Sequence, residues 1–434
     1  MAKIKKKIYP PSKKSRKVWK EFEQAKYTVL EGAVRSSKSY TANFITIKYL
    51  QLIPACNVLI SGYTISSVAR NVIAEWKEII DPYSRGLFRS VKGDKDEYLI
   101  INWRGLKNKK FYIRGGGTDA DYKQIQGSTF GFWLSDETTQ HTESFIHMAI
   151  SRLSLEYSKA IWTLNPDNPF HFLKRNFIDD EKKFRIEEGG FRLYQRFHFL
   201  LEDNPSMTKR VREEYKTQFN GVFYQRYVLG LWTLAEGIIY DMFNHKKHVV
   251  KENDPSNVTN WYVAVDYGTS NPCVFHRYGE SYEGKERKVK YQLFEEYYYC
   301  GREERVQKTD EQYCDDMDEF LNGYYPTAIY VDPSALSFIT ALKSRGYNVI
   351  SADNNVLDGI RLLARVLMSG DLTIHEDCAK TIDEFSLYIW DGKKGERIGE
   401  DAPIKKNDHC MDAMRYFFNE RIGFNVQIDY TKMV

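Results

Sequence analysis

Short apolar runs alternate with amphipathic stretches along the first part of the chain. Residues 26–30 (KYTVL) form a β-rich run, and residues 40–53 (YTANFITIKYLQLI) carry aromatic and aliphatic side chains at helical spacing. The same order returns in residues 57–64 (NVLISGYT), which are mostly apolar, and 66–80 (SSVARNVIAEWKEII), which are amphipathic. Strands that alternate with helices predict an α/β domain with a mostly parallel sheet.

Two later apolar runs of this region end in polar groups. Residues 131–140 (GFWLSDETTQ) and 160–169 (AIWTLNPDNP) each read as a buried strand followed by a polar turn. Residues 97–103 and 109–117 precede them and predict a hairpin or two neighbouring strands. The carboxyl ends of strands in an open α/β sheet are where ligands bind, so a site is expected at this edge.

The pattern changes after residue 260. Residues 261–268 (WYVAVDYG), 273–279 (CVFHRYG) and 290–299 (KYQLFEEYYY) predict three strands of an antiparallel meander. Two further strands and two helices are predicted after them, at residues 327–334, 348–353, 357–370 and 409–422.

Length predicts two domains, because a single hydrophobic core rarely extends over 434 residues. The polar, turn-rich residues 245–260 are typical of a domain boundary. The predicted division is a basic tail at 1–20, a first core at 21–170, a lid or linker subdomain at 171–244, a linker at 245–260 and a second domain at 261–434.

The tail is the one marked charge asymmetry. Residues 1–20 hold nine Lys or Arg and no acid, which suits phosphate contacts and equally a solvated tail. The tail lacks the apolar segment of a secretory signal, and no run of about eighteen apolar residues occurs, so a soluble, intracellular chain with no membrane role is expected. The six cysteines include no C-x-x-C pair, which favours buried thiols over a zinc site or disulfides.

Residues 32–39 (GAVRSSKS) follow the phosphate-loop pattern G-x-x-x-x-G-K-[ST], with Ser37 in place of the second glycine. Gly32 would start the loop, Lys38 would reach the β- and γ-phosphates, and Ser39 would ligate Mg²⁺ at the start of a helix whose dipole favours anions. Serine fits at position 37 only if the backbone keeps a negative φ or tolerates strain. The loop alone leaves a nucleotide site and a lookalike equally open.

Two acids downstream favour the nucleotide site. Asp136 would hold Mg²⁺ and Glu137 would orient the attacking water, a pairing typical of enzymes that hydrolyse ATP. Thr163 and Asn165, on the next strand, either sense the γ-phosphate or form a plain turn. The predicted nucleotide-binding residues are Gly32, Arg35, Ser36, Ser37, Lys38, Ser39, Asp136, Thr163 and Asn165.

Arg35 lies inside the loop itself. Its guanidinium would stabilise transition-state charge in cis or would simply clamp a phosphate or the backbone. Donors from a neighbouring subunit could be Arg114, Lys123 or Arg152, and the sequence does not rank them.

Carboxylates spread over the second domain predict a metal-dependent nuclease. Asp266 and Asp332 follow two of its strands, and His409 and Asp412 lie three residues apart on one face of the last helix. This is the ribonuclease H-like arrangement, which gathers two divalent metals, Mg²⁺ or Mn²⁺, for phosphodiester cleavage. The predicted metal ligands are Asp266, Asp332, His409 and Asp412, with a proton shuttle as the other role open to His409.

Three further acids are given lesser roles. Asp408 is interpreted as the cap of the last helix, with metal binding in place of Asp412 or beside it as the role left open. Glu295 and Glu296 are adjacent on a strand and point to opposite faces, so at most one of them is expected to face the metals.

The motifs GAVRSSKS, GFWLSDE, TLNPDNP, LEDNPSM, LGLWTLAEGIIYDMF, VDYG, YVDPS and KNDHCMDAMRYF follow one another along the chain. Together they resemble the large terminase subunit of tailed bacteriophages, in family order and over almost the whole chain. The resemblance implies a P-loop NTPase domain of the additional-strand motor type, followed by a ribonuclease H-like nuclease domain. It also implies an active nucleotide site despite Ser37, because the family commonly carries an arginine at the position of Arg35.

The resemblance implies roles and partners as well. Catalytic roles would fall on Glu137, Arg35, Asp266, Asp332, His409 and Asp412, while Ser39 and Asp136 would hold the metal of the ATPase. The family cuts concatemeric viral DNA and pumps it into a preformed capsid at the expense of ATP. The implied partners are double-stranded DNA, the portal protein, a small terminase subunit and further copies of the chain in a ring on the procapsid, in the host cell cytoplasm.

The main alternative is a helicase-like or transposase-like ATPase-nuclease of DNA repair or recombination. It would need further helicase motifs and a second motor lobe, which the sequence does not offer. A P-loop kinase is disfavoured by Glu137 beside Asp136. A non-enzymatic DNA-binding scaffold is disfavoured by the full set of catalytic residue types in both domains.

Overall fold

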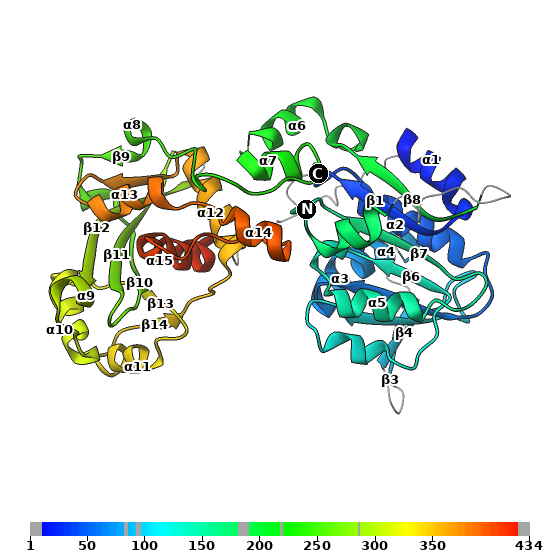
Figure 1. The fold of residues 1–434 in the computed structure, drawn as a ribbon, viewed down its shortest axis with the longest axis horizontal. Helices are drawn as coiled ribbons and strands as arrows, with labels where there is room; N and C mark the ends of the chain where they lie inside the picture. Colours follow the sequence, from blue (N-terminus) through cyan, green and yellow to red (C-terminus); the bar gives the residue numbers. More distant parts are fainter. Residues whose placement is uncertain are drawn as a thin grey trace. The chain divides into compact units, whose positions relative to one another are not determined.

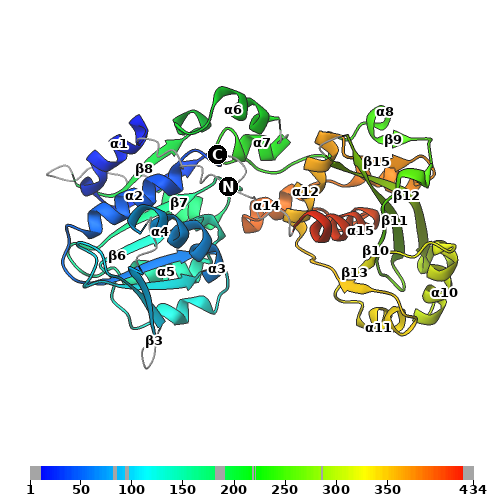
Figure 2. The ribbon, with the colours of Figure 1, turned by 180° about the vertical axis from the view of Figure 1, so that it is seen from behind.

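The computed structural model describes residues 11–81, 86–92, 97–180, 191–217, 219, 221–284 and 287–423. The chain forms two compact units, which Figures 1 and 2 show from opposite sides. The first comprises Met1–Thr217, Val222–Leu234 and Arg397–Glu400, and the second comprises Gln218–Gly221, Ala235–Glu396 and Asp401–Val434. The main crossing between the units therefore lies ahead of the linker expected at 245–260.

An eight-stranded sheet forms the centre of the first unit, in the order β3-β4-β5-β2-β6-β7-β1-β8. Its strands are β1 (Ala25–Gly32), β2 (Asn57–Gly62), β3 (Phe88–Lys92), β4 (Glu97–Ile101), β5 (Lys110–Gly115), β6 (Phe132–Ser135), β7 (Lys159–Leu164) and β8 (Arg192–Phe199). All pairs from β5 to β8 in this order are parallel, whereas β3, β4 and β5 pair antiparallel. Because β7 lies between β1 and β6, the predicted additional-strand α/β fold is confirmed.

Helices cover both faces of this sheet, because successive strand residues point to opposite sides. Leu30 and Leu134 pack in the core on one face, together with side chains of α2 and α4, and Val29 and Trp133 pack in the core on the other face with α5. The helices of the unit are α1 (Lys13–Glu21), α2 (Lys38–Leu50), α3 (Ile65–Val68), α4 (Ala74–Ile80), α5 (Glu143–Ser151), α6 (Lys209–Lys216) and α7 (Gly221–Tyr227). A π-helical turn, Ala69–Ile73, joins α3 to α4.

Part of the expected basic tail is folded. Helix α1 buries Val18 completely, and the hydroxyl of Ser15 lies 2.8 Å from that of Thr41 on α2. Lys14 donates to the backbone carbonyl of His198 at 2.7 Å and pairs with Asp203. Residues 13–20 are therefore packed on the first unit, because the buried Val18 and three polar contacts anchor an otherwise cationic helix. Residues 1–10 lie outside the described part of the chain.

A seven-stranded sheet forms the centre of the second unit, in the order β14-β13-β10-β11-β12-β15-β9. Its strands are β9 (Val249–Val250), β10 (Asn260–Asp266), β11 (Pro272–Glu283), β12 (Lys288–Cys300), β13 (Ala328–Val331), β14 (Val349–Ser351) and β15 (Leu372–His375). The predicted antiparallel meander of β10, β11 and β12 is confirmed, and β13 and β14 extend the sheet in parallel beyond β10. This is the ribonuclease H-like strand order.

Two short strands at one edge of this sheet were not expected from the sequence. Strand β15 pairs in parallel with β12, and β9 pairs with β15. Together with α8 (His245–His248), β9 places residues 245–250 of the expected linker within the second unit. Strands of two to four residues leave too short an apolar pattern to be recognised without their neighbours.

Helices cover both faces of the second sheet as well. On one face, Phe417 of α15 stacks on Tyr278 of β11 with ring centroids 3.9 Å apart. On the other face, side chains of α10 and α11 form a core with β10, β11 and β13. The remaining helices of the unit are α9 (Gly301–Glu304), α10 (Asp310–Leu321), α11 (Leu336–Ser344), α12 (Val356–Ser369), α13 (Ala379–Leu387), α14 (Gly392–Ile398) and α15 (His409–Phe418).

The thiols follow the prediction. All six cysteines are free, five of them are buried, and Cys56 is half-buried. Within the residues that the structure describes, no helix has the length and apolar character needed to cross a membrane.

Phe417→Ala is expected to destabilise the second unit by about 3–5 kcal/mol, because it removes a fully buried ring from the stack between α15 and the sheet. Urea denaturation followed by circular dichroism measures the change. The control is Leu336→Ala, which truncates a side chain that is 70% exposed and should change stability by less than about 0.5 kcal/mol. Equal effects of the two substitutions would contradict the described packing.

Candidate functional site

The loop between β1 and α2 is built against the neighbouring strand β8. Gly32 ends β1 with φ of 131°, and a Cβ atom there would lie 2.0 Å from the carbonyl oxygen of Phe199. The next amide, of Ala33, donates to that same oxygen at 2.8 Å. Only glycine fits this close approach, so the first glycine of the motif is a requirement of the backbone.

Ser37 adopts the conformation that the missing glycine would have taken. Its φ is 74° and its ψ is 17°, in the left-handed region, where a side chain costs about 1–2 kcal/mol. Arg35 also has a positive φ, of 57°. Of the two alternatives left by the sequence, the structure selects strain at Ser37 over a negative φ. The loop therefore has, at Ser37, a backbone conformation that glycine favours, although its sequence departs from the pattern.

Lys38 begins α2 and directs its ammonium into the loop. The nitrogen donates to the carbonyl oxygen of Gly32 at 3.0 Å, to Oδ1 of Asn165 at 3.0 Å, and to the carbonyl oxygen of Ala33. Burial lowers the pKa of Lys38 to about 7, against the charges of Asp136, Glu137 and Glu31, which raise it. The loop thus holds a buried cation within reach of the end of β7.

Asp136 collects polar partners from three elements. Its Oδ1 accepts from the hydroxyl of Thr163 at 2.7 Å and from that of Ser39 at 3.4 Å, and its Oδ2 accepts from the amide of Asn71 at 3.3 Å. Strands β1, β6 and β7 are parallel, so their carboxyl ends lie at one edge of the sheet. The structure therefore brings Ser39, Asp136 and Thr163 together as predicted. The contact of Asn71 could not be predicted from the sequence, because Asn71 lies in the helical segment Ala69–Ile73, 65 residues before Asp136.

Glu137 follows directly and is also in the left-handed region, with φ of 53°. Its backbone amide donates to the hydroxyl of Thr163 at 3.2 Å. Thr163 therefore contacts both acids, one through the carboxylate of Asp136 and one through the backbone of Glu137.

Arg35 lies next to the segment that follows β8. Its carbonyl oxygen accepts from the side-chain amide of Asn204 at 2.7 Å, and its guanidinium carbon lies 5.9 Å from the ring centroid of Tyr215 on α6. Arg114, one of the suggested donors to a neighbouring subunit, is buried with its guanidinium bonded to the backbone oxygens of Glu97 and Ile113. These two backbone oxygens belong to β4 and β5, so the guanidinium of Arg114 contacts the edge of its own sheet.

Residues 227–232 support the loop from outside. A Cβ at Gly230 would lie 2.8 Å from the nitrogen of Ala33, the carbonyl oxygen of Tyr227 accepts from Val34 at 2.9 Å, and the indole of Trp232 donates to Glu31 at 3.1 Å. The sequence analysis assigns this segment to a lid or linker subdomain at 171–244 and names no partner for it. Such contacts join residues about 200 positions apart, which periodicity does not reveal.

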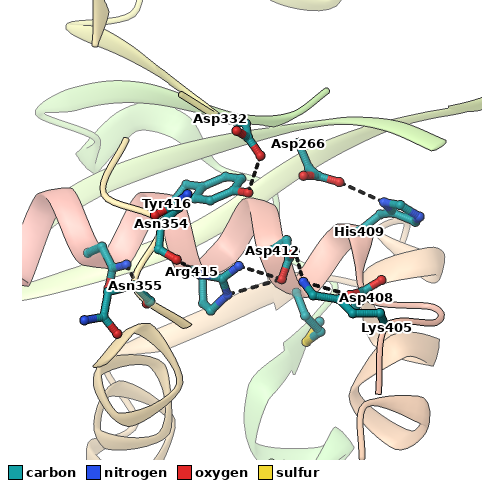
Figure 3. Close-up of polar contacts among 12 residues, drawn as sticks. Asp266, Asp332, Asn354, Asn355, Lys405, Asp408, His409, Asp412, Arg415 and Tyr416 are labelled. Carbon is teal, nitrogen blue, oxygen red and sulfur yellow. Dashed lines mark hydrogen bonds and ion pairs between the residues drawn. The ribbon is translucent and has the colours of Figure 1, made fainter. Parts of the chain in front are cut away.

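The predicted nuclease residues lie at one end of the second sheet, where β10, β13 and α15 meet (Figure 3). Asp266 ends β10, Asp332 follows the parallel neighbour β13, and the amide of Asp332 donates to Val265 at 3.4 Å. His409 and Asp412 lie on the first turn of α15. Nδ1 of His409 is 2.8 Å from Oδ2 of Asp266.

Burial controls the charge of this group. It raises the pKa of Asp266 to about 6, and the charges of Asp412 and Asp332 add to the shift, while the hydrogen bond with His409 opposes it. For His409, burial alone would lower the pKa, but the hydrogen bond and charge of Asp266 outweigh it and raise the pKa. The charge of each of these two side chains therefore depends on the other.

The other two carboxylates have fixed partners that the sequence did not suggest. Asp332 accepts from the hydroxyl of Tyr416 at 2.7 Å. Asp412 accepts from Nε of Arg415 at 3.2 Å and pairs with Lys405 at 3.2 Å (Figure 3). Arg415 and Tyr416 lie one turn further along α15, and the sequence analysis assigns them to a helix but not to the site.

The donor chemistry fits a divalent metal, since three carboxylates and an imidazole suit Mg²⁺ or Mn²⁺. Their ligand atoms do not include three that all lie within 4.8 Å of one another, as a shared metal ion would require. Among the described residues, three possible ligand atoms lie within 4.8 Å of one another only at His276, Glu296 and Cys410. These three surround the hydroxyl of Thr381, which lies 2.9 Å from Nε2 of His276 and donates to Glu296 at 2.7 Å, so they form a buried hydrogen-bonded network.

Glu295 and Glu296 are engaged elsewhere. Glu295 pairs with Arg277. Glu296 accepts from the backbone amides of Lys380 and Thr381 at 2.8 and 2.9 Å. Both acids therefore have roles in packing β12 against its neighbours.

Asp408 does not act as the predicted cap. It occupies the residue before α15, yet within the described part of the chain its side chain makes no capping hydrogen bond. Its Oδ2 lies 3.3 Å from the ammonium of Lys405 instead. The first-turn amides of α15, from Cys410 and Met411, donate to Glu384 of α13. A buried acid from another helix thus replaces the local cap.

The chain is similar to known phage terminases over both of its units. The sequence family described as Terminase RNaseH-like domain matches residues 293–421. The crystal structure of the large terminase from a thermophilic bacteriophage is 36% identical, with a TM-score of 0.84, and the match covers 95% of this chain and 100% of that one. No curated protein sequence matches the chain.

Two further structures of the same thermophilic bacteriophage protein carry nucleotides. Its complex with ADP is 36% identical with a TM-score of 0.82, and the match covers 95% of this chain and 99% of that one. Its complex with ATP-gamma-S is 37% identical with a TM-score of 0.81, and the match covers 94% and 99%.

Ser37→Gly is expected to stabilise the first unit by about 1 kcal/mol, because glycine relieves the left-handed strain at this position. Urea denaturation without added ligand measures the gain. The matched control is Ser36→Gly, which removes a 2.7 Å hydrogen bond to Ala33 and should cost about 1 kcal/mol. A loss of stability in Ser37→Gly would mean that the loop has a different backbone path.

Proposed function

The chain belongs to the large terminase family, and from this we propose that it is the ATP-driven motor and the nuclease of a viral DNA-packaging machine. ATP hydrolysis by the first unit drives double-stranded DNA into a procapsid, and metal-dependent cleavage by the second unit cuts concatemeric DNA. The observation that carries the proposal is the presence, in one chain, of a phosphate-loop cluster and of a carboxylate cluster on a ribonuclease H-like sheet.

The first unit offers each group that ATP hydrolysis requires. Lys38 binds the β- and γ-phosphates by exchanging its loop carbonyls for phosphate oxygens. Ser39 and Asp136, which are hydrogen-bonded to one another, would hold Mg²⁺, and the ion would supply positive charge to the phosphates. Glu137 orients the attacking water. Arg35 either stabilises the transition state or clamps a phosphate.

Thr163 and Asn165 are proposed to report the state of the nucleotide. The hydroxyl of Thr163 bonds the carboxylate of Asp136 and the backbone amide of Glu137, and Asn165 bonds Lys38. A change at the phosphates therefore reaches the end of β7 through two direct contacts. The contacts of residues 227–232 with the loop give a second route, toward the segment that leads into the second unit.

The second unit supplies ligands for two divalent metals, Mg²⁺ or Mn²⁺, which would activate water and steady the leaving oxygen. Asp266, Asp332 and Asp412 hold them, with His409 as a fourth ligand or as a proton carrier. Arg415 and Tyr416 orient Asp412 and Asp332 through their hydrogen bonds.

The partners follow from the proposed role. They are double-stranded DNA, the portal protein, a small terminase subunit and further copies of the chain in a ring on the procapsid, within the host cell cytoplasm. The cationic residues 1–20 would add sequence-independent phosphate contacts, whose strength falls steeply with salt.

Glu137→Gln is expected to lower the kcat of DNA-stimulated ATP hydrolysis by about 10²–10⁴-fold, since the amide does not accept the proton of water. ATP binding and Mn²⁺-dependent cleavage should persist. The control is Glu143→Gln in the first turn of α5, whose carboxylate contacts Asn176 at 2.8 Å and His147 at 3.5 Å. Undiminished hydrolysis in Glu137→Gln would refute its role.

Asp266→Asn is expected to lower the rate of Mn²⁺-dependent cleavage of plasmid DNA by about 10²-fold or more, because a central anionic ligand becomes neutral. The rate of ATP hydrolysis should be retained. The matched control is Asp254→Asn, an acid of the same unit that bonds Ser256. Cleavage that survives in Asp266→Asn would place the nuclease centre elsewhere.

A further inference from the structure

Glu384 is a buried acid that joins two helices of the second unit. It lies on α13 and is only 4% exposed. Its Oε2 accepts from the backbone amide of Cys410 at 2.8 Å and from that of Met411 at 3.2 Å. These amides belong to the first turn of α15, where no intrahelical acceptor is available. A single carboxylate thus satisfies two of the orphan donors of the helix.

We propose that Glu384 is a positioning residue for DNA cleavage. It fixes the first turn of α15, and with it His409 and Asp412, which flank the two bonded amides in sequence. The inference rests on the nuclease function proposed above. Glu384 does not contact the reacting groups, so its effect passes through the backbone of α15.

The local cap is absent, which makes the contact from α13 the anchor of this turn. A residue in the position of Asp408 ordinarily accepts from the second or third amide of its own helix. Among the described contacts of Asp408, the side chain instead pairs with Lys405 at 3.3 Å, and Lys405 also reaches Asp412 at 3.2 Å (Figure 3). The carboxylate of Asp408 therefore shares Lys405 with Asp412, while Glu384 takes the helix amides.

The anchor is itself tied to the central sheet. Glu296 of β12 accepts from the amides of Lys380 and Thr381 at the start of α13. The hydroxyl of Thr381 also contacts His276 of β11. Two carboxylates thus act in series, since one fixes α13 to the sheet and the other fixes α15 to α13. Each carboxyl group also lies at the amino-terminal end of a helix, whose dipole favours negative charge.

The consequence is a defined register between α15 and the strand that carries Asp266. His409 must approach Asp266 to 2.8 Å, and Asp412 must remain on the same side of the helix. Without an acceptor at the first turn, the end of the helix frays, and the ligands lose their common geometry. Loss of a group that orients a metal ligand typically costs about 10–100-fold in activity or metal affinity.

The test compares Glu384→Ala, Glu384→Asp and Glu280→Ala in the full chain. Glu280 is a matched control because it is a buried acid of β11, 1% exposed, that bonds Asn260 at 2.9 Å and pairs with Arg421 beyond the other end of α15. Glu384→Asp keeps the charge but shortens the reach, so it replaces Glu384→Ala if that variant does not fold.

The first measurement is hydrogen–deuterium exchange of peptides that cover residues 405–416. Both Glu384 variants should speed exchange at residues 410–412, and Glu280→Ala should not. The second is Mn²⁺-dependent DNA cleavage, for which the Glu384 variants should show a kcat lower by about 10–100-fold and a higher half-saturating Mn²⁺ concentration. ATP hydrolysis by the first unit should be unchanged in every variant, which separates positioning from general loss of fold.

The outcomes are distinct. Exchange at residues 410–412 equal to that of the wild type, or faster exchange with unchanged cleavage, would overturn the positioning role alone. A general loss that Glu280→Ala shares would also overturn it. A wild-type chain that cuts no DNA under any metal would overturn the nuclease function itself, and with it any catalytic meaning of Glu384.

Discussion

Parallel pairing of strands fixes where the reactive side chains of both units lie. In the first unit, Ser135 of β6 is in register with Trp162 of β7, so the following residues, Asp136 and Thr163, meet at the sheet edge. In the second unit, the parallel pairing of β10 with β13 brings the ends of two strands together in the same way. In each unit, backbone hydrogen bonding between parallel strands therefore brings the strand-end residues of the site together, and a helix adds further side chains.

The two helices that complete these sites use their N-termini differently. In the structure as described, Ser37 ahead of α2 offers its side chain to none of the first-turn amides. That end remains available to an anion, as a phosphate loop requires. At α15, by contrast, Glu384 occupies the first-turn amides and offsets the dipole. The helix end then serves as a fixed platform for His409 and Asp412, whose task is to hold cations.

Much of this could be predicted from the sequence, because the decisive signals are local. The alternation of strands and helices reflects side-chain periodicity, which a short window contains. Motif spacing likewise gave Lys38, Asp136, Asp266 and Asp412 as candidates, and each of them stands at the end of a strand or on the first turn of a helix. The order β10, β11, β12 followed from polar turns between three strand-like runs. In each of these cases the cause of the structure lies within about ten residues.

The tertiary structure alone decided the rest. The left-handed backbone of Ser37 depends on packing around the loop, the cap of α15 comes from Glu384 rather than from Asp408, and α1 folds where a tail was expected. Each of these outcomes rests on contacts between segments far apart in the chain, whose energies no local pattern contains. The sequence thus determined which residues stand at the sheet edges. Long-range burial and hydrogen bonding determined which partners hold them in place.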